Sequence, residues 1–350
     1  MAEPKTAADR QMASTLGALN RHAFLNVTVV TMAIQSEIQL VTDLFGGSVA
    51  DTALFLSTTS GFVGLTEFLL NPTIGRLSDR FGRRFFLLVG CSYCAVGNAI
   101  VGLLPVSRSL VAVNRVLSWA LLTVSGSVVG SAAVSDCSAP GVDLSVNLGS
   151  FFSSFGLGVI VGPAIGGWVL ARTGSPQAVY LARAATALFE VLHDLVFLPE
   201  TLGLRERLQG LPSPKIPPVS IVSPLAFTRL FSGPRTMVKL CVATFLVCWA
   251  EGKNTNDLFQ LWMKQDVGLG VGNANLMTIV YGVFMFCGGK LFAPAIIRSV
   301  GPRAFTSLSL AGQTLGLGLW GTVASRFSLI GGLLLQFISV NVSQACHHLT

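Results

Sequence analysis

Ten apolar segments, each long enough to cross a lipid bilayer as a helix, constrain the fold of this chain more than any other feature. A membrane-spanning helix needs about 20 mainly apolar residues. Since 51% of the residues are hydrophobic and 11% are charged, a soluble domain is excluded. The sequence predicts an all-α polytopic membrane protein. Its segments run over residues 24–42, 52–74, 85–105, 109–134, 148–171, 177–198, 237–260, 273–297, 304–324 and 328–346.

The polar parts of the chain divide it into four regions. Residues 1–22 are polar and mixed in charge, with no apolar core of a signal peptide. Residues 201–235 are rich in proline and basic side chains and are expected to link two helical bundles, 23–200 and 236–350. Lys and Arg gather in the N-terminus and in the second, sixth and eighth connections, which predicts that the N-terminus and the linker are cytoplasmic. The same distribution explains the excess of 23 basic over 16 acidic residues without nucleic acid.

The connection between the second and third segments carries the motif Gly-Arg-Leu-Ser-Asp-Arg-Phe-Gly-Arg-Arg at residues 75–84. Glycines at both ends allow a tight reversal, and the arginines favour the cytoplasmic side. The alternative is an ordinary basic loop. The stretch resembles, position for position, the loop between the second and third helices of major facilitator superfamily transporters. The resemblance implies a conformational latch made of Gly75, Asp79, Arg80, Gly82, Arg83 and Arg84.

This resemblance implies two six-helix bundles with a solute site between them near the membrane midplane. The first bundle is intact in the sequence, whereas the second has only about four segments before Thr350. We therefore expect an incomplete second bundle and a chain that does not transport alone. The family's partners of Asp79, an Arg after the fourth helix and the eleventh helix, are absent from the sequence, so Asp79 is expected to lack them.

The fifth segment contains a glycine stripe with a proline, Gly-x-x-x-Gly-Pro-x-x-Gly-Gly. Small residues at this spacing let a second helix approach closely. Simple small-residue packing is the alternative to a mechanistic role. The pattern resembles the fifth-helix signature of proton-coupled antiporters, including drug and tetracycline exporters, and this implies a hinge or seal. Its members are Gly158, Gly162, Pro163, Gly166 and Gly167.

Two ionisable residues inside the segments are the candidates for a proton or substrate pathway. Arg115 should face a cavity or an acidic partner, because a lipid-facing Arg costs about 3 kcal/mol or more. It resembles the fourth-helix arginine of the same exporters, although Trp119 replaces the expected glycine. The alternative is an Arg that extends to the nearer interface. Glu67 lies in the middle of its segment and is the candidate titrating acid.

The other intramembrane charges receive less specific expectations. Arg183, Glu190 and Asp194 share one helix face, which predicts either an Arg183–Glu190 structural pair or a functional pathway. Glu37 lies nearer the outer end of its segment, where contact with water is the simpler expectation. Pro199-Glu200-Thr201 matches the end of the sixth helix in the superfamily and is interpreted as a boundary marker, not a site.

The sequence therefore predicts a transporter of a small organic solute that works by alternating access, most simply a proton antiporter. Its expected partners are the solute, protons and the lipid bilayer, with no nucleic acid. No cofactor, metal or catalytic site is expected, since the lone Cys91-x-x-Cys94 lies inside an apolar segment. Residues 250–270 resemble the seventh helix of eukaryotic proteins related to the hippocampus abundant transcript. A transport-inactive binding partner or sensor and a nutrient uniporter remain the alternatives.

Overall fold

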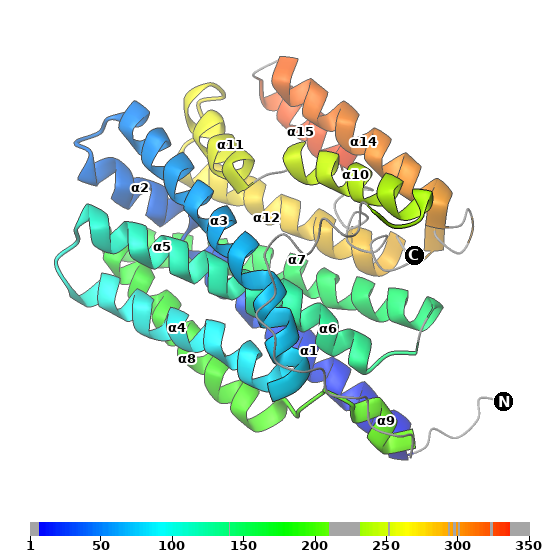
Figure 1. Cartoon of the computed structure of the whole chain (residues 1–350). Helices are drawn as coiled ribbons and strands as arrows, with labels where there is room; N and C mark the ends of the chain where they lie inside the picture. The colour runs from blue at the N-terminus through cyan, green and yellow to red at the C-terminus, as the bar shows by residue number, and fades with distance from the viewer. Residues whose placement is uncertain are drawn as a thin grey trace.

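The computed structural model describes residues 7–139, 141–209, 232–250, 253–292, 295–296, 299, 302–322 and 325–336. Within these residues the secondary structure is helical and contains no strand, as predicted (Figure 1). Six described segments are long and apolar enough to cross a membrane: Ala7–Leu44, Val49–Phe81, Arg83–Leu103, Arg108–Asp136, Val146–Thr173 and Gly272–Phe292. Most of the predicted linker and the last residues of the chain lie outside the described residues.

The first six predicted segments each correspond to a long helix or a pair of joined helices. The first is broken at Ala33 into two helices, and the fourth passes through a π-helical turn, η1. A short helix, α9, follows the sixth segment. The helices are α1 (Ala7–Met32), α2 (Ile34–Leu44), α3 (Val49–Phe81), α4 (Arg83–Leu103), α5 (Arg108–Thr123), η1 (Val124–Val129), α6 (Gly130–Asp136), α7 (Val142–Thr173), α8 (Pro176–Phe197) and α9 (Leu204–Gln209).

Helices also occupy the described parts of the four later segments. They lie on one side of the first bundle, with α12 running beside α7 (Figure 1). Residue Glu251, another intramembrane acid of the sequence, lies outside the described residues. The helices are α10 (Arg235–Ala250), α11 (Lys253–Gln265), α12 (Val271–Cys287), η3 (Gly288–Phe292), α14 (Pro302–Thr322) and α15 (Arg326–Gln336).

The glycine stripe of α7 lies directly against the backbone of α1. A Cβ added at Gly158 would stand 2.8 Å from the carbonyl oxygen of Phe24, and one at Gly166 would overlap the carbonyl oxygen of Met32. The Thr31 hydroxyl donates a hydrogen bond to the carbonyl oxygen of Gly158 at 3.0 Å. Because lipid is as apolar as the side chains, helices in a membrane associate mainly through such close packing and interhelical hydrogen bonds. Only glycine permits this approach of α7 to α1.

The contact of α7 with Met32 coincides with the break in the first segment. The helix α1 ends at Met32 and α2 begins at Ile34, with the Glu37 amide bonded to the Ala33 carbonyl oxygen at 2.7 Å. A break at this depth is tolerated only where neighbouring protein surrounds it. Pro163, one residue after Gly162, is buried on α7, and the helix continues through it.

The two parts of the molecule meet along α7 and α12, again through glycine. A Cβ on Gly156 of α7 would lie 2.5 Å from the backbone nitrogen of Phe286, and one on Gly282 of α12 would lie 2.9 Å from the carbonyl oxygen of Gly156. A second contact joins α3 to α11, where Leu261 packs with Leu56. The first bundle therefore touches the later helices at two places, α7 with α12 and α3 with α11.

The glycine contact predicts a position-specific effect of one methyl group on α7. In Gly162→Ala the new Cβ meets the Thr31 hydroxyl and the Thr28 carbonyl oxygen, so we expect a loss of about 1–3 kcal/mol in the free energy of unfolding. In Gly149→Ala, on the same helix, the Cβ has no neighbour within 4 Å. This control should be neutral or gain up to about 1 kcal/mol of helix propensity. Thermal unfolding of the purified variants in detergent measures both, and equal melting temperatures would contradict the contact.

Candidate functional site

An ion pair between α5 and α2 occupies the interior of the first bundle. Arg115 Nη1 lies 2.6 Å from Glu37 Oε1, and both side chains are buried, with exposed fractions of 4% and 6%. Two hydroxyls of α3 complete the site: Arg115 Nε donates to Thr59 Oγ1 and Nη2 donates to Ser60 Oγ, both at 3.0 Å. All three donor nitrogens of the guanidinium thus have acceptors. A buried pair is stable only under these conditions, because two charges must leave water to form it.

Local structure places the members of this pair. Ser107 caps the start of α5 by accepting a hydrogen bond from the Leu110 amide, which fixes the helix that carries Arg115. The break at Ala33 separates α2 from α1, and Glu37 lies in the first turn of α2. The carboxylate therefore belongs to a short helix that starts at a discontinuity in the membrane.

The expectations for Arg115, Glu37 and Glu67 have different outcomes in the structure. Arg115 faces an acidic partner, one of the two surroundings expected from the cost of its burial. The expectation that Glu37 contacts water is wrong, since its side chain is enclosed by the bundle. Glu67 is half-buried on α3, seven residues beyond Ser60, and the groups that hold Arg115 come from Glu37, Thr59 and Ser60 instead.

A group of amides connects this region to the later helices. Gln35, two residues before Glu37, donates from Nε2 to Gln260 Oε1 of α11 at 2.6 Å. Gln260 in turn donates to Thr278 Oγ1 of α12 at 3.4 Å. All three residues are buried, and Oε1 of Gln35 has no hydrogen-bond partner. The arrangement is a polar contact between the two parts of the molecule, built from neutral hydrogen-bonding groups. Sequence reasoning missed it, although polar residues inside apolar segments were the available signal.

The Gly75–Arg84 motif forms its own ion pairs at one end of the bundle, called here the motif end. Arg83 Nη2 lies 2.6 Å from Asp79 Oδ1, and Arg83 Nε lies 3.0 Å from Asp136 Oδ2 at the end of α6. Arg83 Nη1 also donates to Ser78 Oγ at 2.6 Å. Asp79 thus has a partner within the motif itself, while the expectation that it lacks the two partners implied by the family resemblance stays a prediction.

Glu200 holds the turn of the same motif. Its carboxylate accepts hydrogen bonds from the backbone amides of Arg83 at 2.8 Å and Arg84 at 3.2 Å, which are the first residues of α4, and from Leu202 at 2.9 Å. A carboxylate at a helix N-terminus satisfies free amides and interacts favourably with the helix dipole. The helix α8 ends at Phe197, close to the predicted boundary. Pro199-Glu200-Thr201 therefore follows the end of the helix as expected, and Glu200 in addition caps the start of α4.

Glycine is required at position 82 for two reasons. Its φ angle is +99°, a conformation that other residues rarely adopt. A Cβ there would also overlap the Glu200 carboxylate. Of the remaining motif residues, Arg80 stacks over the ring of Phe81, with 5.6 Å from Cζ to the centroid, and Arg84 donates to the Leu195 carbonyl oxygen. Gly75 has open space around it.

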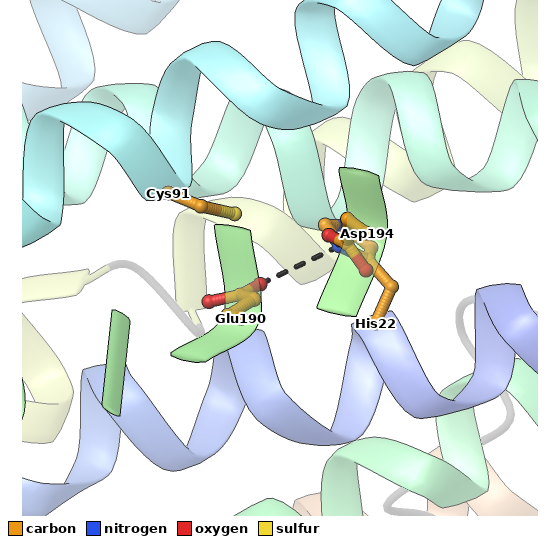
Figure 2. A group of neighbouring side chains, drawn as sticks. All are labelled: His22, Cys91, Glu190 and Asp194. Carbon is orange, nitrogen blue, oxygen red and sulfur yellow. Dashed lines mark hydrogen bonds and ion pairs between the residues drawn. The ribbon is translucent and has the colours of Figure 1, made fainter. Parts of the chain in front are cut away.

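A second buried cluster joins α8 to α1 (Figure 2). His22 Nδ1 lies 2.6 Å from Asp194 Oδ2 and 3.4 Å from Glu190 Oε1, and all three side chains are fully buried. The predicted Arg183–Glu190 pair does not form: within the described residues, Arg183 Nε and Nη2 have no hydrogen-bond partner. The prediction failed because α1 supplies a histidine that sequence periodicity along α8 does not reveal. His22 was missed, and its place in the polar stretch before the first apolar segment gave little signal.

The described residues contain one group of His, Cys and carboxylate side chains close enough to surround a single cation. The polar atoms of His22, Cys91, Glu190 and Asp194 lie within 4.8 Å of one another, and all four residues are buried. Cys91 and Cys94 are free thiols rather than a disulfide.

Comparison with known proteins identifies what the chain resembles. The sequence profile of the Major Facilitator Superfamily matches residues 22–348. Hippocampus abundant transcript-like protein 1 of Mus musculus is 27% identical over 283 residues, covering 77% of this chain and 51% of that protein. Tetracycline resistance protein, class C, of Escherichia coli is 26% identical over 252 residues, covering 72% of this chain and 60% of that protein. The chain thus spans about half the length of the first of these relatives.

Solved structures share the fold. The crystal structure of the human organic anion transporter MFSD10 (TETRAN) superposes with a TM-score of 0.73 at 19% identity, covering 95% of this chain and 84% of that chain. The proton:xylose symporter XylE superposes with a TM-score of 0.64 at 13% identity, covering 95% and 81%. At this level of identity the similarity establishes the helical arrangement and nothing finer.

The Arg115–Glu37 pair predicts an asymmetry between single and double substitutions. Arg115→Met leaves the Glu37 carboxylate buried without its cation, so we expect a loss of about 3–5 kcal/mol in stability. Arg115→Met combined with Glu37→Gln removes both charges and should lose much less. Unfolding of the wild type, Arg115→Met, Glu37→Gln and the double variant completes the cycle, and additive losses would contradict the pairing.

The Glu200 cap predicts local opening of α4. Glu200→Ala removes the acceptor of three backbone amides, and we expect a loss of about 0.5–2 kcal/mol. Hydrogen exchange should accelerate at the amides of Arg83 and Arg84, while amides in the middle of α4 keep their protection. Glu200→Gln retains one acceptor oxygen and should lie between the two proteins. Unchanged exchange at Arg83 in Glu200→Ala would contradict this role.

Proposed function

The chain belongs to the Major Facilitator Superfamily, a family of solute transporters rather than enzymes in general, and from this premise we propose that it exports a small organic solute in exchange for protons. The observation that carries the proposal is the buried ion pair of Arg115 and Glu37. An ionisable pair inside a membrane bundle is costly and marks a functional pathway by default. Here the pair adjoins the contact between the two parts of the molecule.

Protonation gives the pair two distinct states. When Glu37 is ionised, Arg115 is neutralised and α2 is tied to α5. When Glu37 binds a proton, the attraction is lost and the guanidinium becomes an unpaired buried cation that must find another partner or water. Protonation of Glu37 thus changes the free energy of the contact between α2 and α5 by several kcal/mol, the scale needed to shift a conformational equilibrium.

The neighbouring amides supply a path from that change to the solute. Gln35 and Glu37 lie in the same turn of α2. Gln35 donates a hydrogen bond to Gln260 of α11, and so joins the first bundle to the later helices. Movement of α2 therefore acts on Gln35, Gln260 and Thr278 together. Their neutral donors and acceptors suit a solute with several hydrogen-bonding groups. One relative is named for tetracycline resistance, and tetracycline is a solute with several hydrogen-bonding groups.

We place the motif end in the cytoplasm, following the distribution of Lys and Arg. In this orientation Asp79, Arg83 and Asp136 form the latch at the cytoplasmic end. Glu200 holds the turn between α3 and α4 that contains Arg83. The glycine stripe of α7 acts as the seal against α1. Residues 1–22 and the linker 201–235 lie on the same side of the membrane, with 23–200 and 236–350 as the two bundles.

Reconstitution in liposomes with an imposed pH gradient tests the proposal, with tetracycline as the probe. Tetracycline should accumulate along the gradient when the transporter is active. The gradient-driven rate of Glu37→Gln should be at least about tenfold lower than that of the wild type, which corresponds to about 1.4 kcal/mol of activation free energy. Exchange without a gradient should persist. Glu67→Gln is the comparison, because Glu67 is the other candidate titrating acid and the Arg115 contacts described above come from Glu37, Thr59 and Ser60.

Each alternative has its own outcome in this assay. Loss of coupling in Glu67→Gln but not in Glu37→Gln would move the coupling acid to Glu67. Uptake that is independent of the gradient would indicate a uniporter. Binding of the probe without uptake at any pH would indicate a transport-inactive binding protein.

A further inference from the structure

We propose that His22 and Glu190, together with Asp194, form a second proton-binding site inside the first bundle, distinct from the Arg115–Glu37 pair. This His22–Glu190 site lies between α1 and α8 (Figure 2). It is toward the motif end, because Arg84 donates to the carbonyl oxygen of Leu195, the residue after Asp194. It goes beyond the proposed transport function, since it concerns where the bundle stores a proton whether or not solute moves.

The first argument is the balance of buried charge. Apart from Arg83, which is neutralised at the motif end by Asp79 and Asp136, the buried ionisable groups of the described helices are three carboxylates and two guanidinium groups. One negative charge therefore remains if His22 is neutral. An uncompensated charge inside a membrane bundle is expensive, so the interior must hold one further proton. The groups counted are Glu37, Glu190, Asp194, Arg115 and Arg183.

The hydrogen bonds indicate where that proton belongs. Asp194 uses both of its oxygens: Oδ2 pairs with His22 Nδ1 at 2.6 Å and Oδ1 with His193 Nδ1 at 2.9 Å. Glu190 is fully buried, yet neither of its oxygens has a hydrogen-bond partner. Its Oε1 lies 3.4 Å from His22 Nδ1, too far for a good hydrogen bond. Glu190 is thus the buried carboxylate with the least support for its charge, and a proton shared with His22 removes the charge.

The groups that face Glu190 from the other helices do not replace this proton. From α4, Cys91 donates its thiol hydrogen to the Leu87 carbonyl oxygen, and Cys94 is a buried neutral thiol one turn away. From α1 and η1, Asn26 donates to Ser125 Oγ at 3.3 Å. On α8 itself, Arg183 is the nearest cation along the helix and makes no ion pair with Glu190. The site is therefore surrounded mainly by neutral groups.

A chain of hydrogen bonds connects the site to the surface. Arg21 is exposed and donates from Nε to His193 Nε2 at 3.1 Å, so the other nitrogen of His193 carries the proton that it donates to Asp194. Asp194 contacts His22, and His22 lies next to Glu190. When water replaces Arg21 at His193 Nε2, His193 can gain a proton there and give its Nδ1 proton to Asp194. His22 gives its Nδ1 proton to Glu190 and regains one at the same nitrogen from Asp194. One proton is moved, and His193 is left as the other tautomer, which returns to its starting form when the ring turns over.

The geometry favours a proton over a metal ion. His22 Nδ1 and Asp194 Oδ2 are 2.6 Å apart, the length of a direct hydrogen bond. Two nitrogen or oxygen ligands of one tetrahedral zinc ion stand about 3.3 Å apart, given bond lengths of about 2.0–2.1 Å. Cys91 is also occupied as a hydrogen-bond donor. The cluster is therefore built as a hydrogen-bonded group around a proton.

Infrared difference spectroscopy of the full chain in lipid nanodiscs tests the inference, since a protonated carboxyl has a carbonyl band that the carboxylate lacks. The wild-type protein should show a buried carboxyl band that disappears reversibly as the pH is raised. Glu190→Gln should lose this band. Asp143→Asn, at an exposed carboxylate, should keep it. Glu37→Gln should also keep it, so that failure of this inference is separate from failure of the transport proposal.

Further measurements keep the inference testable if Glu190→Gln does not fold. His22→Gln should move the midpoint of the titration by about one pH unit or more, because it removes the group that shares the proton. After equilibration with Zn²⁺, the wild-type protein should have no zinc bound at the cluster. Its zinc content should therefore equal that of His22→Gln. The inference is overturned if the band survives in Glu190→Gln, if the midpoint is the same in His22→Gln, or if zinc binds in a 1:1 ratio through this cluster.

Discussion

The backbone contact between α1 and α7 is the constraint on which the rest of the first bundle depends. Without water to drive apolar surfaces together, the two helices need an approach close enough for backbone atoms to touch, and Gly158, Gly162 and Gly166 provide it. The contact ends beside Met32, where the first segment breaks. Everything that α1 and α2 carry is therefore positioned from α7.

The charged groups show how a membrane bundle holds ions that it cannot expose. Arg115 has a carboxylate and two hydroxyls for its donor nitrogens, and Asp194 has a histidine at each oxygen. These groups are fully paired and fix helices to one another. Glu190 and Arg183 are buried without such support. An unsupported ionisable group is stable only if its charge can change or a ligand can reach it, whereas a paired group such as Glu37 can change its charge only by releasing its partner.

The sequence predicted the features that depend on neighbouring residues in one helix or loop. The fold class, the family, the Gly75–Arg84 turn and the burial of Arg115 follow from apolar length, local motifs and the cost of a charge in lipid. The partners of the charges did not follow, because they lie on other helices. Glu37 was expected in water, but it pairs with Arg115 of α5. Glu190 was expected to pair with Arg183 along α8, but it lies next to His22 of α1. Glu200 was interpreted as a boundary marker, and it also caps the start of α4. Periodicity reports which residues share a face and says nothing about the helix opposite.

The first membrane segment carries one member of each of the two proposed proton sites. His22 lies on α1 and Glu37 on α2, on opposite sides of the break at Ala33, while α7 packs against α1 between them. In the proposed mechanism a proton bound near His22 weakens or strengthens the contact of α8 with α1, and one bound at Glu37 does the same for the contact of α5 with α2. Both contacts belong to a segment that is held against α7 through the glycine stripe. Under this proposal the close approach of α7 matters for function as well as for stability, because it is the contact that both protonation events leave in place.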